Sequence, residues 1–175
     1  MESIARSEHP VNPVNALDTP TTITDPAMVD QTEKFRALSA TASFNEWAGI
    51  QVVRVVAGEC DLLLTWRGDE MGQYAGFLHA GLIAALLDTA CGFAAAAIVG
   101  SVLSSHFSMN CLAPAVGDEF IATGRVVKSG RKQIFTSGEL HAHRDGRSKL
   151  VATANTILVP TDVAIELDQP PLASS

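Results

Sequence analysis

An aspartate in the middle of an apolar segment is the most informative residue of this 175-residue sequence. Removing a carboxylate from water is costly, so its burial must be offset by hydrogen bonds or serve a function. Residues that share the helical face of Asp88 by three- and four-residue spacing are all small: Gly81, Ala84, Ala85, Cys91, Gly92 and Ala95. Either these small residues let another helix approach while Asp88 caps a backbone group, or they leave room for a ligand whose reacting carbon meets the carboxylate. We favour the second interpretation.

The turn before this segment supplies a second group that could do chemistry. Residues 76–81 read Gly-Phe-Leu-His-Ala-Gly and open directly into the expected helix. The first backbone N–H groups of a helix have no partner inside it, and the helix dipole is positive there. The N–H of Ala80 would therefore polarise a carbonyl or hold an oxyanion, and Gly81 would allow close backbone approach. Because every helix has such an end, this signal is not specific by itself.

Charge is unevenly distributed along the chain. The net charge is -7, which disfavours general binding of nucleic acid or anionic lipid. The stretch from Arg125 to Lys149 nevertheless holds seven of the twelve cationic residues, opposed only by Glu139 and Asp145. A solvated strand face and a local site for a phosphate-bearing ligand explain this excess equally well.

Hydrophobic periodicity and turn residues predict the elements that position these groups. The central helix should run from His79 to about Val99. It should follow a short helix, a turn and two strands and precede four strands: Gln31–Leu38, Phe44–Trp47, Ile50–Val56, Cys60–Arg67, Val102–Leu112, Glu119–Lys128, Lys132–His143 and Leu150–Val159. Tight turns between successive strands indicate an antiparallel sheet, and so apolar a helix needs cover on nearly all sides. We therefore predict an α+β domain, in which a curved sheet wraps around one long helix and an open edge favours a dimer.

Three further features place the chain in its general class. Residues 31–160 should form the domain, between a flexible arm over 1–30 and a tail over 161–175 in which residues 163–167 could add a short edge strand. Asp88 splits the apolar run into pieces too short for a membrane span. Three widely spaced cysteines without disulfide or metal spacing, and an N-terminus without an apolar leader, predict a cytoplasmic protein.

The remaining polar candidates are expected to be structural. His141 and His143 share a strand face but have no third ligand at suitable spacing, so no metal is expected. His106 should be buried or lie at an interface, while Phe107 and Met109 should line the core or a pocket. Phosphate-binding loops and serine-hydrolase motifs are absent from the sequence.

The motif Gly-x-x-His-x-Gly followed by Ile-x-x-Leu-Leu-Asp-Thr-Ala resembles the hotdog-fold thioesterases of the phenylacetate-degradation (PaaI) type. Five other stretches match the same family in order: 47–50, 112–115, 117–118, 126–131 and 150–154. The resemblance covers about residues 44–159. It implies a hotdog fold and hydrolysis of an acyl-CoA thioester.

The resemblance also implies roles for single residues. Asp88 falls at the catalytic carboxylate, as general base or nucleophile, and Ala80 falls where a backbone N–H polarises the thioester carbonyl. The family usually has Gly at that second position. Gln73 matches a residue that helps to hold the carbonyl or water, Ser104 one that orients the attacking water, and His79 a positioning residue.

Hydrolysis of an acyl-CoA would also require residues that bind the substrate. Lys128, Arg131 and Lys132 would meet the phosphates of CoA, with His79 and Gly81 beside the thioester, and no metal or redox cofactor is needed. Gly92 falls where the 4-hydroxybenzoyl-CoA branch of the superfamily carries a Thr, which leaves Ser104 to orient water.

Geometry adds a separate expectation about assembly. Eight residues separate Ala80 from Asp88, which is about 12 Å along a helix. One thioester therefore cannot meet both groups of one chain. The expected assembly is a homodimer with two shared sites, or a pair of such dimers.

Two other functions compete with hydrolysis. A hotdog hydratase or dehydratase is one, but its Asp-x-x-x-x-His motif is absent from the sequence. A non-catalytic acyl-CoA-binding protein on the same fold is the other. The acyl group stays open.

Overall fold

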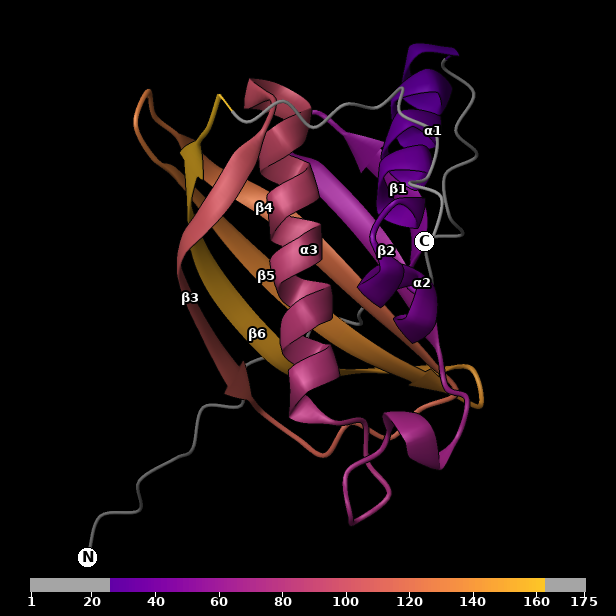
Figure 1. Cartoon of the computed structure of the whole chain (residues 1–175). Helices are drawn as coiled ribbons and strands as arrows, with labels where there is room; N and C mark the ends of the chain where they lie inside the picture. Colours follow the sequence, from indigo (N-terminus) through magenta and orange to yellow (C-terminus); the bar gives the residue numbers. More distant parts are fainter. Residues whose placement is uncertain (1–25, 163–175) are drawn as a thin grey trace, which may run out of the picture.

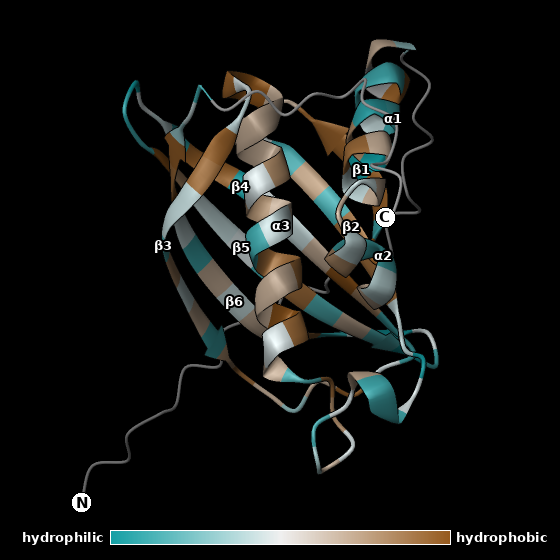
Figure 2. Ribbon diagram, in the orientation of Figure 1, coloured by the Kyte–Doolittle hydropathy of each residue, from teal (hydrophilic) through white to brown (hydrophobic). Residues whose placement is uncertain are grey.

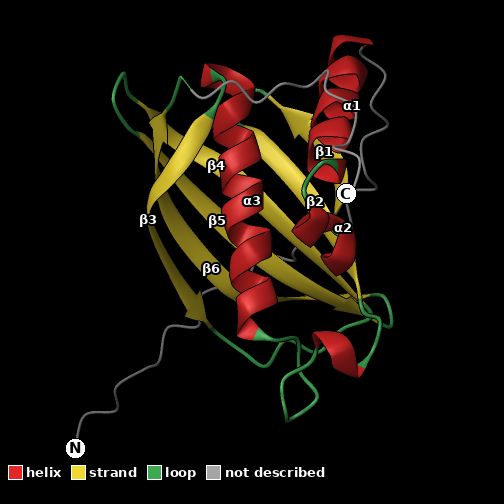
Figure 3. Cartoon of the chain, viewed as in Figure 1, coloured by secondary structure: helices red, strands yellow, loops and turns green. Residues whose placement is uncertain are grey.

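The computed structural model describes residues 26–162 as one antiparallel sheet with its helices on one side (Figures 1 and 3). The six strands lie in the order β1-β2-β4-β5-β6-β3. In chain order the elements are α1 (Pro26–Ala40), α2 (Ser43–Ala48), β1 (Gln51–Val56), β2 (Glu59–Thr65), the 3-10 helix η1 (Asp69–Met71), α3 (Ala80–Val99), β3 (Val102–Cys111), β4 (Glu119–Ser129), β5 (Ile134–Arg144) and β6 (Arg147–Pro160). This is the expected curved sheet around one long helix, and the strand boundaries agree with the sequence prediction to within a few residues.

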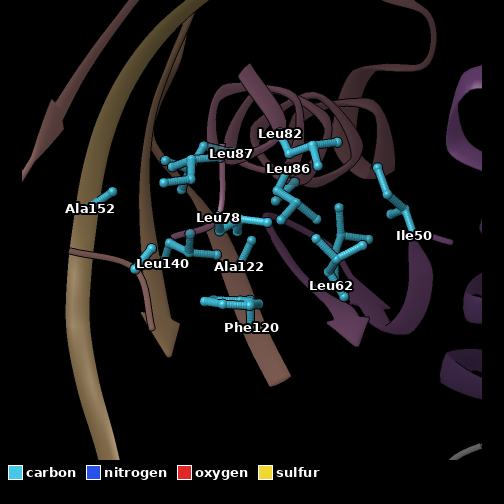
Figure 4. Packing of buried hydrophobic residues seen from close by; sticks show 14 of the residues in the cluster. Ile50, Leu62, Leu78, Leu82, Leu86, Leu87, Phe120, Ala122, Leu140 and Ala152 are labelled. Atoms are coloured by element: carbon cyan, nitrogen blue, oxygen red, sulfur yellow. The ribbon is translucent and has the colours of Figure 1, made fainter. Parts of the chain in front are cut away.

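The concave face of the sheet and one face of α3 form the core. Strand alternation decides which side chains enter it: in β5 the buried residues are Ile134, Thr136, Gly138, Leu140 and Ala142. Helix residues such as Leu86 and Leu87 meet Phe120 and Ala122 of β4 in this layer (Figure 4).

Gly124 lets α3 lie directly on β4. A Cβ added at this glycine would stand 2.4 Å from the backbone carbonyl carbon and oxygen of Ala90. No side chain larger than hydrogen fits at that point, so the contact between helix and sheet there is backbone against backbone.

The second face of α3 is not covered by its own chain, which corrects the expectation that the helix is buried on nearly all sides. Ala84, Ala85, Asp88, Gly92 and Ala96 are only partly buried, and they line one face. A second correction concerns the small residues grouped around Asp88: two of them, Cys91 and Ala95, are fully buried against the sheet.

Helix α3 is also the one described helix that is long and apolar enough to cross a membrane. Its apolar colouring in Figure 2 is explained by the face that packs into the sheet, since a core helix passes the same test.

The two edges of the sheet differ in how their backbone groups are satisfied. At the β1 edge, the Thr32 hydroxyl accepts from the N–H of Val55 at 3.1 Å, and the Arg36 guanidinium donates to the carbonyl of Val52 at 2.8 Å. Both side chains come from α1, which lies along that edge (Figure 1). Strand β3 forms the other edge, is ten residues long and is exposed over most of its length. Its outer row of N–H and C=O groups is therefore unpaired within the described residues.

Three expectations change at the periphery of the fold. The first helix begins at Pro26 rather than at Gln31, so ordered structure extends into the segment assigned to the arm. A 3-10 turn over Asp69–Met71 stands where only a loop was expected. The expected edge strand over 163–167 lies outside the described residues.

Candidate active site

Asp88 lies on the open face of α3 and is joined to β3 by a hydrogen bond. The Ser104 hydroxyl donates to Oδ1 of Asp88 at 2.7 Å. Both residues line a cleft of about 280 Å³, whose other lining residues are Leu38, Gly92, Phe93, Ala96, Val102, Leu103 and Leu158. A half-buried carboxylate held by a hydroxyl in a mostly apolar cleft can take a proton from water or attack an electrophilic carbon.

The start of α3 leaves one backbone donor free. His79 is the N-cap residue, with φ -63° and ψ 134°, and its Nδ1 accepts from the N–H of Gly81 at 2.9 Å. The backbone carbonyl of His79 accepts from Leu82 and Ile83. The N–H of Ala80 donates to no group among the described residues. His79 thus orders the helix start, and Ala80 supplies the available N–H at the positive end of the helix dipole.

Gln73 stands in the turn that leads to this helix start. Its backbone N–H donates to the carbonyl of Phe77 at 2.8 Å, and its side-chain oxygen accepts from the N–H of Ala75 at 2.7 Å. The turn is closed by a bridge between Gly72 and Leu78. Because the side-chain oxygen of Gln73 already accepts this hydrogen bond, the side-chain NH₂ is the group that can donate to a ligand.

A separate cleft of about 320 Å³ opens beside the helix start. It is lined by Phe44, Trp47, Glu70, Gly72, His79, Gly81 and Leu82. This cleft and the cleft at Asp88 have no lining residue in common. Within one chain, the structure therefore brings Ser104 to Asp88 but does not bring Ala80 and Gln73 to them.

The structure divides the cationic stretch into paired and unpaired residues. Arg125 lies 3.6 Å from Glu59 and 3.9 Å from Glu139, and Arg144 lies 3.9 Å from Asp145. Lys128, Arg131 and Lys132 are exposed at the β4–β5 hairpin and form no ion pair within residues 26–162. Arg125 therefore lies on a solvated strand face among acidic neighbours. Lys128, Arg131 and Lys132 stay available to bind an anion.

Strand register relates this hairpin to Ser104. Ser104 is opposite Leu158, Leu158 is opposite Ile134, and Ile134 is opposite Ser129. Three strand spacings of about 4.8 Å place the base of the hairpin about 14 Å from Ser104. The hairpin and the carboxylate thus lie at a similar level of the sheet.

The histidine and aromatic candidates from β3 and β5 line neither of these two clefts. No group of three His, Cys, Asp or Glu residues that could hold a metal occurs in the described part of the chain. His106 is exposed on β3, so the expectation that it is buried is wrong. A position at an interface stays a prediction. Phe107 and Met109 pack against the core, as expected.

The cysteines contribute no nucleophile to either cleft. Burial raises the pKa of the Cys60 and Cys91 thiols, which keeps them protonated. Cys111 is exposed at the end of β3. None of the three lines the clefts at Asp88 or at the helix start.

A third cleft, of about 460 Å³, was not predicted from the sequence. It lies between α1 and the end of α3, where the Phe35 and Phe93 rings are 5.0 Å apart. Its lining includes Leu38 and Ala96, which also line the cleft at Asp88. No sequence signal points to this cleft, because it depends on how α1 docks beside α3.

A curved antiparallel sheet wrapped around one long helix is the hotdog architecture. The family model described as "Thioesterase superfamily" matches residues 75–149. A thioesterase family protein from Silicibacter pomeroyi is 31% identical, with a TM-score of 0.70 over 74% of this chain and 96% of that chain. At this identity and coverage the relation is established, and the chain belongs to the hotdog-fold thioesterase superfamily.

More distant structures share the fold. AziG of S. sahachiroi is 25% identical with a TM-score of 0.61, over 68% of this chain and 96% of that one. The PaaI protein of the E. coli phenylacetic acid degradation operon is 19% identical with a TM-score of 0.68, over 77% and 95%. No curated protein matches the sequence significantly. Activity on thioesters or esters is thus supported at the level of the family.

Proposed function

We propose that this protein hydrolyses acyl-CoA thioesters, with Asp88 as its catalytic carboxylate, in the manner of PaaI-type enzymes. The observation that carries the proposal is the hydrogen bond of 2.7 Å from Ser104 to Asp88, inside a mostly apolar cleft of a thioesterase-superfamily fold. Sixteen residues separate the two groups in sequence, and the fold joins a carboxylate to a hydroxyl that can hold water beside it.

The chemistry would use four groups. The N–H of Ala80 and the side-chain NH₂ of Gln73 would donate to the thioester oxygen and stabilise its negative charge as the carbonyl carbon is attacked. Asp88 would accept the proton of a water held by Ser104, and the water oxygen would bond to that carbon. The carbon–sulfur bond then breaks, the CoA thiolate takes a proton, and the free acid leaves. Direct attack by Asp88 would instead form an anhydride that water opens.

These groups require two chains, because Ala80 and Asp88 are about 12 Å apart along α3. The sheet edges support a specific pairing. Side chains of α1 satisfy the β1 edge, whereas the outer row of β3 is unpaired. A long, exposed edge strand is a template for pairing with another chain. Antiparallel pairing of two β3 strands around a two-fold axis would bring the helix start of one protomer toward Asp88 of the other.

Substitution of the carboxylate tests the proposed chemistry. Asp88→Asn is nearly isosteric and should lower the rate of thiol release from acyl-CoA at least about a hundredfold, with little change in Tm. Asp145→Asn is the matched control, because Asp145 has φ 52° in the β5–β6 turn, where Asn is equally tolerated. Activity of Asp88→Asn within a few-fold of wild type would refute the assignment. Tight acyl-CoA binding without thiol release would favour a binding protein, and hydration of an enoyl-CoA would favour a hydratase.

Subunit exchange tests the shared site. Inactive Asp88→Asn and inactive Gln73→Ala proteins are mixed so that protomers exchange. In a mixed dimer, one site then collects both defects and the other is intact. Random exchange makes about half the dimers mixed, so activity should recover to about a quarter of wild type. With exchange verified by a tag on one variant, absence of recovery would exclude a site built from two chains.

A further inference from the structure

The cleft at Asp88 adjoins the cleft between α1 and α3. Leu38 of α1 and Ala96 of α3 line both. The first cleft contains the carboxylate, and the second ends near Gly100, at the far end of α3. The two volumes, of about 280 and 460 Å³, adjoin at these residues and follow α3 from Asp88 toward Gly100, and together they are called the passage.

The walls of this passage are mostly apolar beyond the reacting end. Among the described residues that line the first cleft, only Asp88 and Ser104 have polar side chains. In the second, Gln31 donates to the carbonyl of Ala97 at 3.3 Å, and Lys34 is 2.6 Å from Asp30. Because Gln31 and Lys34 already have protein partners, neither requires a polar ligand, and the third polar side chain of this lining, Ser101, lies past the end of α3. An alkyl chain fits this lining better than a polar acyl group.

We infer that the passage holds the acyl chain of the substrate, and that Gly92 and Ala96 set how long that chain can be. This inference rests on the proposed hydrolysis of acyl-CoA. A Cβ added at Gly92 would meet nothing within 4 Å, so the space over this glycine is open. Ala96 lies one further turn along the same face, at the point where the two clefts join.

Helix geometry converts these positions into chain lengths. Gly92 and Ala96 lie about 6 and 12 Å beyond Asp88 along the helix axis. A saturated carbon–carbon bond of about 1.5 Å advances an extended chain by about 1.3 Å. The carbonyl carbon at Asp88 therefore places about the fifth carbon at Gly92 and about the tenth at Ala96. The substrates are straight-chain acyl-CoA thioesters of about ten carbons or more, with the chain end under Phe35.

The test is a thiol-release panel from butanoyl- to hexadecanoyl-CoA on full-length protein. In wild type, kcat/KM should rise at least tenfold from hexanoyl- to decanoyl-CoA, since each buried methylene contributes up to about fourfold. Gly92→Leu should lower decanoyl-CoA activity at least tenfold more than it lowers butanoyl-CoA activity. Ala96→Leu should lower dodecanoyl-CoA activity at least tenfold more than it lowers octanoyl-CoA activity.

Ala37→Leu is the matched control, because Ala37 is exposed on α1 and lines neither cleft. It should leave the whole profile unchanged, and Tm is measured for each variant. Equal loss at every chain length in both α3 variants would overturn the inference, because a folding defect does not depend on the substrate. So would a wild-type preference for acetyl or arylacetyl groups. Absence of thiol release from every thioester would instead refute the proposed function itself.

Discussion

The contact between Gly124 and α3 yields a prediction in which stability and activity change together. In Gly124→Ala, the new methyl carbon would stand 2.4 Å from the carbonyl of Ala90 and 2.6 Å from the N–H nitrogen of Cys91. Ordinary contacts of a Cβ begin near 3.4 Å. The difference, 3.4 minus 2.4, means that strand and helix must separate by about 1.0 Å, because backbone atoms cannot rotate away.

The cost follows from that separation. Overpacking of a core usually costs about 1–3 kcal/mol, and a clash with backbone should lie at the upper end. At about 2–4 °C per kcal/mol for a chain of this size, Tm should fall by about 6–12 °C. Asp88 is two residues from Ala90 on the displaced helix, and a shift of about 1 Å in a catalytic group can cost about a hundredfold in rate.

Gly138→Ala is the matched control, since this glycine pairs with Gly124 on the neighbouring strand. Its added Cβ would stand 3.0 Å from Cδ2 of Leu87 and 3.2 Å from the sulfur of Cys91. Both are side-chain atoms that can move, so the loss of Tm should be less than half as large. Thermal unfolding and thiol release are measured for both variants. A Gly124→Ala protein that melts within about 2 °C of wild type, or that is no worse than Gly138→Ala, would refute the packing argument.

Three further predictions concern single side chains. Ser104→Ala should lower kcat about ten- to a hundredfold at unchanged KM, because water and Asp88 lose their shared partner; a change within twofold would contradict its role. Arg131→Ala should raise KM for CoA thioesters and spare short thioesters that lack the nucleotide, and an equal effect on both would indicate a structural role. Burial, followed by the neighbouring His141, lowers the pKa of His143 below 6.5. The unfolded chain therefore binds this proton first, stability falls as pH drops below about 6.5, and His143→Asn should lose less Tm than wild type between about pH 7.5 and 5.5.

Much of the fold was predictable because its signals are local. Alternation over 134–140 marks which residues of β5 enter the core, and Gly-containing turns mark the hairpins. The apolar run after His79 marks α3 within a residue of its bounds. Asp88 stood out for the same reason, because a charge inside an apolar run is visible without any knowledge of the fold.

The sequence by itself therefore determined the strand order along the chain, the extent of the central helix, and the carboxylate on it. Only the tertiary structure decided which face of that helix is open. Periodicity groups Cys91 with Asp88, but Gly124 and Gly138 seat Cys91 against the sheet and leave Gly92 facing the cleft. Periodicity measures angles around one helix axis, whereas the direction of the sheet is set by contacts with residues more than thirty positions away. The passage between α1 and α3 depends on the same kind of distant contact, and for that reason no sequence pattern points to it.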